Sequence, residues 1–220
     1  MGCVVITGAN RGIGLELCKL YVKAGHEVYG ACRQTSKGLT DSGAHVIEGV
    51  DVSAVDGIEA LTQALHGKSI DILINNAGIL KSQSLGTIDY ADVERQFVVN
   101  AIGPLRITEA LLPNLRKGAK VALITSRMGS IADNTSGGSY GYRMSKAALN
   151  AAGMSLARDL EPRGVSVAIL HPGYVQTDMV GGSGDITPAV SAERLAQRIE
   201  ELNLKTSGGF WHSNGEQLPW

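Results

Sequence analysis

The feature that most constrains this fold is a glycine-rich run that directly follows a short apolar segment. Residues 3–7 read CVVIT, a β-branched, apolar stretch that is typical of a strand buried on both faces of a parallel sheet. The run TGANRGIG at residues 7–14 comes next, and apolar residues then recur at helical spacing as far as Val22. A strand, a glycine-rich turn and a helix are the context of a dinucleotide-binding motif, in which the phosphates lie at the helix N-terminus. The start of the chain therefore predicts a dinucleotide site.

Each glycine of this run has a separate physical role. Gly8 permits a tight turn, Gly12 lets the backbone approach a pyrophosphate, and Gly14 lets the helix pack closely on the strand. Three residues separate the first pair and one separates the second, whereas the common dinucleotide fingerprint has one and two. An ordinary glycine-rich turn is the alternative, and the flanking strand and helix patterns argue against it.

Strand-like and helical patterns alternate along the whole chain. This alternation predicts a single-domain α/β Rossmann fold over residues 1–220, a doubly wound parallel sheet of about seven strands with helices on both faces. Pro104 and Pro113 predict a kink or interruption in the helical stretch 90–114, and the polar segment 33–44 is expected to lack a helix. Strand-like runs fall at residues 4–7, 27–32, 45–48, 70–74, 121–125, 165–170 and 210–211, and helical patterns at 12–24, 55–66, 90–114, 142–160 and 191–202.

Composition narrows the classes of partner. The net charge is −1, aromatic residues make up 5% of the chain, and no basic run is present, which argues against nucleic acid and anionic membranes as partners. No apolar stretch reaches the length of a membrane span, and the first strand leaves no room for a secretion signal. Three cysteines fit no metal-binding spacing and suit a reducing compartment. We therefore expect a cytoplasmic protein that binds no metal.

A phenol and an ammonium lie one helical turn apart in the second half of the chain. Tyr142 and Lys146 share a helix face because residues four apart do so. An ammonium close to a phenol favours the phenolate, so Lys146 is expected to lower the pKa of Tyr142 toward neutrality. Tyr142 would then serve as general acid in carbonyl reduction and as base in alcohol oxidation. Tyr140 lies six residues from Lys146 and does not have this geometry.

Six motifs in order resemble the short-chain dehydrogenase/reductase family, and most closely its group of C-factor proteins and sniffer-type carbonyl reductases. The motifs are the glycine run, Asp51-Val52, Asn75-Asn76-Ala77-Gly78, Asn100, Ser126 with Tyr142 and Lys146, and Pro172-Gly173 with Thr177. The resemblance implies Asn100, Ser126, Tyr142 and Lys146 as catalytic residues, with Ser126 bonded to the substrate oxygen and Asn100 holding a water that links Lys146 to solvent. The residues expected to contact the cofactor are Gly8, Asn10, Arg11, Gly12, Ile13, Gly14, Arg33, Asp51, Val52, Asn76, Ala77, Gly78, Tyr142, Lys146, Pro172, Gly173, Val175 and Thr177.

The serine assignment has a rival. Ser126 lies sixteen residues before Tyr142, a few more than is usual in the family, and the surplus falls in the polar segment 133–139. Ser130 could therefore take the serine role. We favour Ser126 because it follows the strand-like run directly.

The charge pattern predicts NADP(H) in preference to NAD(H). Sites for NAD usually carry an acid about 20 residues beyond the glycines, where it binds the ribose 2′-hydroxyl. Residues 30–34 read GACRQ here, without an acid. Arg11 and Arg33 are instead placed to bind a 2′-phosphate, since guanidinium donates two hydrogen bonds in one plane. The alternative is that both arginines are solvated surface residues.

These patterns together predict an NADP(H)-dependent oxidoreductase that reduces a ketone or aldehyde or oxidises the alcohol. The glycine-bearing segment at about 178–190 is expected to form a short substrate lid, the alternative being a flexible connector. Two other functions are alternatives to this oxidoreductase. One is a signalling or sensor protein that binds the cofactor with little turnover, and the other is a sugar-nucleotide epimerase, which needs a larger substrate domain.

The helix after Tyr142 is apolar on more than one face, so we expect a homo-oligomer, a dimer or tetramer, rather than a monomer. Candidate pocket walls are Leu80, Met128, Tyr174 and Met179.

Overall fold

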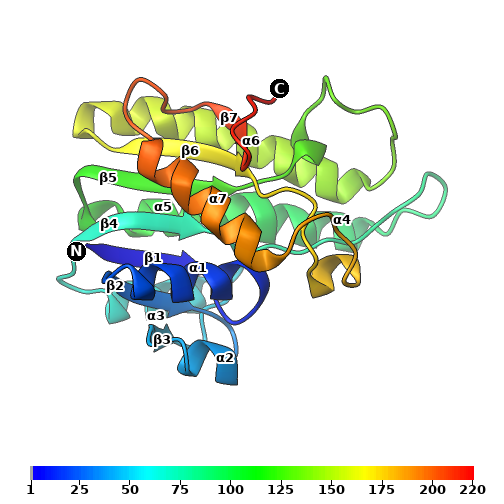
Figure 1. Cartoon of the computed structure of the whole chain (residues 1–220). Coiled ribbons are helices and arrows are strands. Elements are labelled where there is room, and N and C mark those ends of the chain that lie inside the picture. Colours follow the sequence, from blue (N-terminus) through cyan, green and yellow to red (C-terminus); the bar gives the residue numbers. More distant parts are fainter. Residues whose placement is uncertain (1) are drawn as a thin grey trace.

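The computed structural model describes residues 2–220 and contains one parallel sheet of seven strands in the order β3-β2-β1-β4-β5-β6-β7 (Figure 1). Strand order reverses between β1 and β4, which is where a doubly wound sheet opens a crevice at the carboxyl ends of its strands. The predicted fold class is confirmed. The strands are β1 (Cys3–Thr7), β2 (Glu27–Ala31), β3 (His45–Ile47), β4 (Ile70–Asn75), β5 (Leu115–Ile124), β6 (Ser166–His171) and β7 (Phe210–His212).

Helices cover both faces of the sheet and enclose two apolar clusters. Leu17 of α1, Leu39 of α2 and Leu195 of α7 belong to one cluster, and α1 and α7 cross the same side of the strands in Figure 1. Helices α3, α5 and α6 contribute Leu61, Ile107 and Leu149, among others, to the cluster on the other face. The helices are α1 (Gly12–Lys23), α2 (Lys37–Thr40), α3 (Val55–Ala64), α4 (Tyr90–Phe97), α5 (Gly103–Ala110), α6 (Tyr140–Leu160) and α7 (Pro188–Glu201).

The helical stretch predicted at residues 90–114 is interrupted, as its two prolines indicate. A π-helical turn, Val98–Ile102, separates α4 from α5, and Pro104 lies in the first turn of α5, where a missing N–H does no harm. Pro113 lies in a short 3₁₀ turn, Leu112–Asn114, beyond the helix. The π-helical turn places Asn100 between two helical segments, a type of irregularity that is frequent at functional sites.

Three boundaries differ from the sequence expectations for local reasons. The polar segment 33–44 holds one helical turn, α2, because the Ser36 hydroxyl accepts a hydrogen bond from the N–H of Leu39. Helix α6 begins at Tyr140, two residues earlier than expected. Helix α7 begins at Pro188 because Thr187 caps it, so the loop before α7 ends earlier than the predicted lid, 178–190. Within residues 2–220, no helix has the length and apolar character needed to cross a membrane.

Candidate active site

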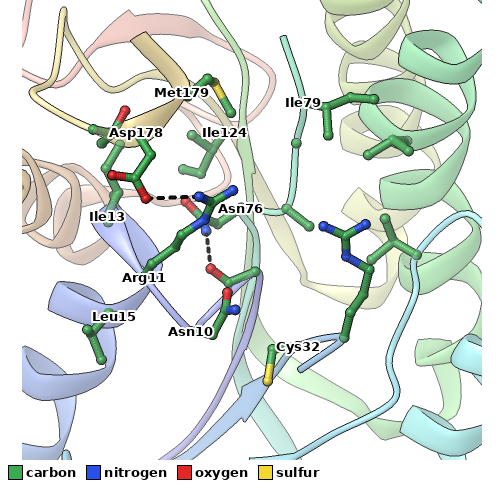
Figure 2. Close-up of a pocket in the computed structure, with 18 of the residues that line it drawn as sticks. Asn10, Arg11, Ile13, Leu15, Cys32, Asn76, Ile79, Ile124, Asp178 and Met179 are labelled. Carbon is green, nitrogen blue, oxygen red and sulfur yellow. Dashed lines mark hydrogen bonds and ion pairs between the residues drawn. The ribbon is translucent and has the colours of Figure 1, made fainter. Parts of the chain in front are cut away.

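A cleft of about 730 Å³ lies where β1, β4 and β5 end, and it gathers most of the predicted site residues (Figure 2). Ile124 and Thr125 line it at the end of β5, and Asp178 and Met179 line it from the loop after β6. The predicted residues that line the cleft are Gly8, Asn10, Arg11, Gly12, Ile13, Arg33, Asp51, Val52, Asn76, Ala77, Gly78, Tyr142, Lys146, Pro172 and Thr177. The predicted residues Gly14, Asn100, Ser126, Gly173 and Val175 are not among its lining residues.

The glycine loop is packed too closely for side chains. Gly8 and Gly12 have left-handed backbone, with φ of 66° and 54°. A methyl group on Gly14 would collide with the carbonyl oxygen of Gly8 and lie 2.6 Å from Nδ2 of Asn76. Helix α1 follows with no side chain capping its N-terminus, which leaves backbone N–H groups facing the cleft. This geometry suits the pyrophosphate of a dinucleotide.

The Asn-Asn-Ala-Gly segment holds the glycine loop in place. Nδ2 of Asn76 donates to the carbonyl oxygens of Thr7 (3.0 Å) and Gly8 (3.2 Å). The hydroxyl of Thr7 accepts hydrogen bonds from the N–H groups of Asn76 and Ala77, both at 3.1 Å. Side chains of adjacent strands therefore lock β1 to β4 at the edge of the cleft. In this structure Asn76 bonds to the protein backbone itself.

Cations surround the part of the cleft next to the end of β2. Arg33 follows β2, and the chain from Gly30 to Gln34 contributes no acid to the cleft. The carboxylate of Asp51 accepts hydrogen bonds from the hydroxyl (2.5 Å) and N–H (2.9 Å) of Ser53, and these bonds hold its pKa below the usual range. The charges of Arg33 and Arg95 lower the Asp51 pKa further. The sequence motifs did not indicate Arg95, because α4 brings it to the cleft through tertiary packing.

The loop after β6 docks directly on the glycine loop. A guanidinium nitrogen of Arg11 lies 2.9 Å from a carboxylate oxygen of Asp178, and Figure 2 shows the two side chains pointing toward each other. A methyl group on Gly12 would lie 3.4 Å from the Thr177 side chain. Arg11 is therefore paired with the loop that carries the predicted lid, a contact that no sequence motif indicated.

Helix α6 places the predicted phenol and ammonium in the same buried region. Tyr142 and Lys146 lie on one face of α6 and are 8% and 4% exposed. The Lys146 Nζ lies 5.8 Å from the centroid of the Tyr142 ring and donates a 2.8 Å hydrogen bond to the carbonyl oxygen of Ile124. The predicted pair is thus assembled at the floor of the cleft.

The titration of this pair differs from the sequence expectation. Burial raises the pKa of Tyr142 to about 12, and a hydrogen bond with Ser126 opposes the rise. Burial also lowers the pKa of Lys146 to about 8. Lys146 therefore does not bring the phenol toward neutrality, because both groups are removed from water and the ammonium is bonded to Ile124. Tyr142 stays protonated at neutral pH, the state needed to donate a proton.

The structure separates the two candidate serines. Ser126 follows the end of β5, where its hydroxyl accepts a 3.1 Å hydrogen bond from the N–H of Met128 and lies close enough to the Tyr142 phenol to oppose the rise of its pKa. The hydroxyl of Ser130 instead accepts a 3.1 Å hydrogen bond from the N–H of Asp133 within its own loop. Ser126 is the serine next to the reacting groups.

Asn100 is buried, and its side chain bonds to the protein. Its Oδ1 accepts from the N–H of Ile79 (2.8 Å), and its Nδ2 donates to the Ile79 carbonyl (2.9 Å) and to the hydroxyl of Ser145 (3.0 Å). A methyl group on Gly78 would lie 3.2 Å from Oδ1 of Asn100 and 3.7 Å from Nζ of Lys146. The Asn100 side chain thus fixes the segment after β4 beside Lys146, and its predicted role in holding a water remains a prediction.

The segment that carries the predicted lid has a narrow, paired base. The N–H of Gln176 donates to the Ile186 carbonyl (3.0 Å), and the N–H of Asp185 donates to the Tyr174 carbonyl (2.8 Å). Gly184 lies so close to this strand-like pair that a methyl group would be 2.6 Å from the N of Gln176. Residues 174–176 and 184–186 thus pair at the base of the segment, and residues 177–183 lie between them. Within residues 2–220, no group of three or more His, Cys, Asp or Glu side chains could hold a metal ion.

Comparisons with known proteins agree with this geometry. The profile of the short chain dehydrogenase family matches residues 2–186. The chain belongs to the short-chain dehydrogenase/reductase family. The 1-hydroxy-2-glutathionyl-2-methyl-3-butene dehydrogenase of Rhodococcus sp. (strain AD45) is 41% identical over 226 residues, with 100% of both chains covered. The C-signal of Myxococcus xanthus is 51% identical over 154 residues, which cover 69% of this chain and 93% of that protein.

Two solved structures extend the likeness to the whole architecture. The carbonyl reductase Sniffer of D. melanogaster superposes with a TM-score of 0.92 at 33% identity, with 100% of both chains covered. The NADPH-bound carbonyl reductase from chicken fatty liver gives a TM-score of 0.91 at 28% identity and covers 100% of this chain and 99% of its own. This short-chain dehydrogenase/reductase is therefore an oxidoreductase of Rossmann-type fold.

Proposed function

We propose that this protein is an NADP(H)-dependent reductase of ketones or aldehydes that also oxidises the corresponding alcohols. The observation that carries the proposal is that Tyr142 and Lys146 lie at the floor of a cleft whose other end fits a dinucleotide, with Ser126 buried behind the phenol. A protein that only bound the cofactor would have no need of a buried phenol bonded to a buried serine.

The residues divide the chemistry of reduction among them. The nicotinamide supplies the hydride when the cofactor is bound. Tyr142 donates its phenolic proton to the carbonyl oxygen, and Ser126 hydrogen-bonds that oxygen as negative charge develops on it. Lys146 does not lower the resting pKa of the phenol to neutrality, but its ammonium lies 5.8 Å from the ring centroid and can stabilise the negative charge that develops on Tyr142 as the proton leaves. The glycine loop, which Asn76 holds in place, and the N-terminus of α1 would hold the pyrophosphate of the bound cofactor.

The preference for NADP(H) follows from the charges at the end of β2. Arg33 lines the cleft there and would pair with the 2′-phosphate, and Arg11, which also lines the cleft, would have to leave its ion pair with Asp178 to do the same. The carbonyl reductase from chicken fatty liver, which has this fold, binds NADPH. Arg33→Ala should raise KM for NADPH by about tenfold, the loss expected for one charge-assisted contact, with little change for NADH. Cys32→Asp should shift the preference toward NADH, and equal use of both cofactors by the wild type would overturn the assignment.

A second candidate function rests on the similarity to the C-signal of Myxococcus xanthus, namely a cofactor-binding signalling protein with little turnover. Oxidation of NADPH by the purified protein distinguishes the two candidates. The panel should hold apolar aldehydes, ketones and quinones, with a glutathionyl alcohol assayed in the oxidative direction because the Rhodococcus relative is named for one. Turnover supports the reductase. Tight NADPH binding without turnover on any of them would favour the signalling protein.

Three further expectations remain proposals. We propose that residues 1–220 act as a single domain whose segment at about 178–190 covers the substrate. A homo-oligomer is proposed through the outer face of α6, where Met144 is 51% exposed, and light scattering at micromolar concentration tests it. The three cysteines are free and buried, which supports a cytoplasmic location.

A further inference from the structure

The catalytic helix differs from three other helices in how it begins. The side chains of Ser36, Asp89 and Thr187 cap α2, α4 and α7, and each accepts a hydrogen bond from an N–H of its own first turn. Helix α6 starts from Ser139, whose backbone is left-handed (φ 47°, ψ 43°) and whose side chain makes no cap. The first N–H groups of a helix have no partner within it, so those of α6 need acceptors from elsewhere.

Gln83 supplies these acceptors from a distant segment. Its Oε1 accepts a 2.8 Å hydrogen bond from the N–H of Gly141, and its backbone oxygen accepts one of 2.8 Å from the N–H of Ser139. Its Nε2 donates to the carbonyl of Asp89, the cap residue of α4, at 3.2 Å. The Gln83 side chain is buried, so water does not compete for these bonds. One amide thus joins the start of α6 to the start of α4.

The start of α6 is also fixed sterically. A methyl group on Gly141 would lie 2.6 Å from Nε2 of Gln96 and 3.0 Å from both Oε1 of Gln83 and Cα of Val93. The helix end therefore fits closely against α4, and a shift of the cap would move it. Tyr142 is the next residue, so its phenol moves with this turn. Small displacements of a reacting group have large effects on rate.

We propose that Gln83 is a positioning residue, which caps the catalytic helix and thereby sets the position of Tyr142 relative to Ser126. The inference rests on the proposed reductase function. Gln83 is not among the residues that line the cleft, and both hydrogen bonds of its side chain go to the backbone at the starts of α4 and α6. Its effect is expected in kcat and in the pH dependence of oxidation, while the affinity for NADPH, which the glycine loop determines, is retained.

Three variants test the proposal. Gln83→Leu keeps the size of the side chain and removes the acceptor, and should lower kcat by about tenfold with Kd for NADPH within about twofold. Gln83→Glu keeps an acceptor and should restore most of kcat at neutral pH. Its negative charge near the phenol should move the alkaline rise of alcohol oxidation to higher pH. Gln96→Leu is the matched control, because Gln96 is buried and packs against Gly141 as Gln83 does, but its hydrogen bonds go to the backbone of Lys81 and Asp92 and it gives α6 no acceptor.

The proposal is supported if Gln83→Leu loses kcat while Gln96→Leu, at a similar loss of Tm, keeps it. Wild-type kcat and pH profile in Gln83→Leu, or an equal loss in Gln96→Leu, would overturn it. Should Gln83→Leu not fold, failure of Gln83→Glu to shift the pH profile would overturn it as well. Hydrogen exchange at the Gly141 amide gives a readout that needs no turnover, and it should be faster in Gln83→Leu and unchanged in Gln96→Leu. If the wild type were inactive but this difference in exchange were still observed, the reductase function would be contradicted, while the capping of α6 by Gln83 would still be supported.

Discussion

The two ends of the cleft are built by different means. The cofactor end is shaped by backbone, because Gly8, Gly12 and Gly14 leave room where a single methyl group would collide or force a strained conformation. The catalytic end is shaped by side chains that are buried and hydrogen-bonded over long sequence separations, such as Lys146 to Ile124 and Asn100 to Ile79. The cofactor end therefore offers a rigid surface of fixed shape, whereas the catalytic end holds ionisable side chains whose protonation state affects the reaction.

Because of this difference, different kinds of substitution should impair the two ends. Adding atoms should damage the cofactor end, whose contacts are steric. Removing a functional group should damage the catalytic end, whose buried polar groups depend on one another. Only the catalytic end should respond strongly to pH, since Tyr142 and Lys146 both have shifted pKa values.

The largest effect is expected from Lys146→Met. The substitution keeps an unbranched side chain and removes the ammonium beside the phenol, so kcat should fall by about 10³, within the range for loss of a group that assists proton transfer. Binding of NADPH, followed by its fluorescence, should weaken much less than kcat. A Lys146→Met protein that lost its affinity for NADPH and kept its kcat would contradict the assignment of separate functions to the two ends of the cleft.

Replacing the serines should give the next effect. Ser126→Ala removes the hydroxyl bonded to Tyr142, and kcat should fall by about 10², the loss typical of one donor to a developing oxyanion. Ser130→Ala is the matched control, since its hydroxyl serves only its own loop, and kcat should stay within about twofold of the wild type. Equal losses of kcat in the two variants would contradict the choice of Ser126 and make Ser130 an equal candidate for the catalytic serine.

At the cofactor end, Gly14→Ala and Gly12→Ala separate collision from strain. A methyl group at Gly14 meets the Gly8 carbonyl, whereas at Gly12 it has space beside Thr177 and only the left-handed backbone is unfavourable. Gly12→Ala should lower the unfolding free energy by about 1–2 kcal/mol. Gly14→Ala should lower it by about 3 kcal/mol and should also abolish NADPH binding. Urea unfolding measures both. A Gly14→Ala protein as stable as Gly12→Ala would show that the loop can move.

The last effect is a pH dependence of stability. The folded-state pKa of Lys146 is about 8, below its ordinary 10.5, so the unfolded chain binds more protons between these values. Burial of the charged lysine therefore costs stability below pH 8, and the cost fades as pH rises toward 10.5. The unfolding free energy of the wild type should rise relative to that of Lys146→Met by at most about 1.4 kcal/mol per pH unit in this window. A constant difference between the two proteins from pH 8 to 10 would contradict the shift.

The sequence predicted the cofactor end better than the catalytic end, for a physical reason. Glycine spacing after a strand dictates a local backbone shape, so the positions of Gly8, Gly12 and Gly14 followed from neighbouring residues alone. The pKa of Tyr142 depends on burial, which comes from the packing of α6 against α4, β6 and the turn at residues 127–129, and the simple spacing to Lys146 gave the wrong direction.

Contacts between distant segments could not be predicted from the sequence either. Nothing local indicates that Asp178 pairs with Arg11, that Arg95 reaches the cleft from α4, or that Gln83 caps α6. The helical boundaries were off by two or three residues where caps decide them, as at Tyr140 and Pro188. The breaks at Pro104 and Pro113 were predicted because proline acts locally.

The central claim is that Tyr142 delivers the proton in a hydride transfer from NADPH, and one measurement tests it most directly. The wild type and Tyr142→Phe are mixed with NADPH deuterated at nicotinamide C4 and an aldehyde that the wild type reduces, and the deuterium in the alcohol is followed by mass spectrometry. The account predicts deuterium transfer by the wild type, and in Tyr142→Phe a rate lower by about 10² or more with NADPH still bound. Transfer by Tyr142→Phe at a rate near that of the wild type would contradict it.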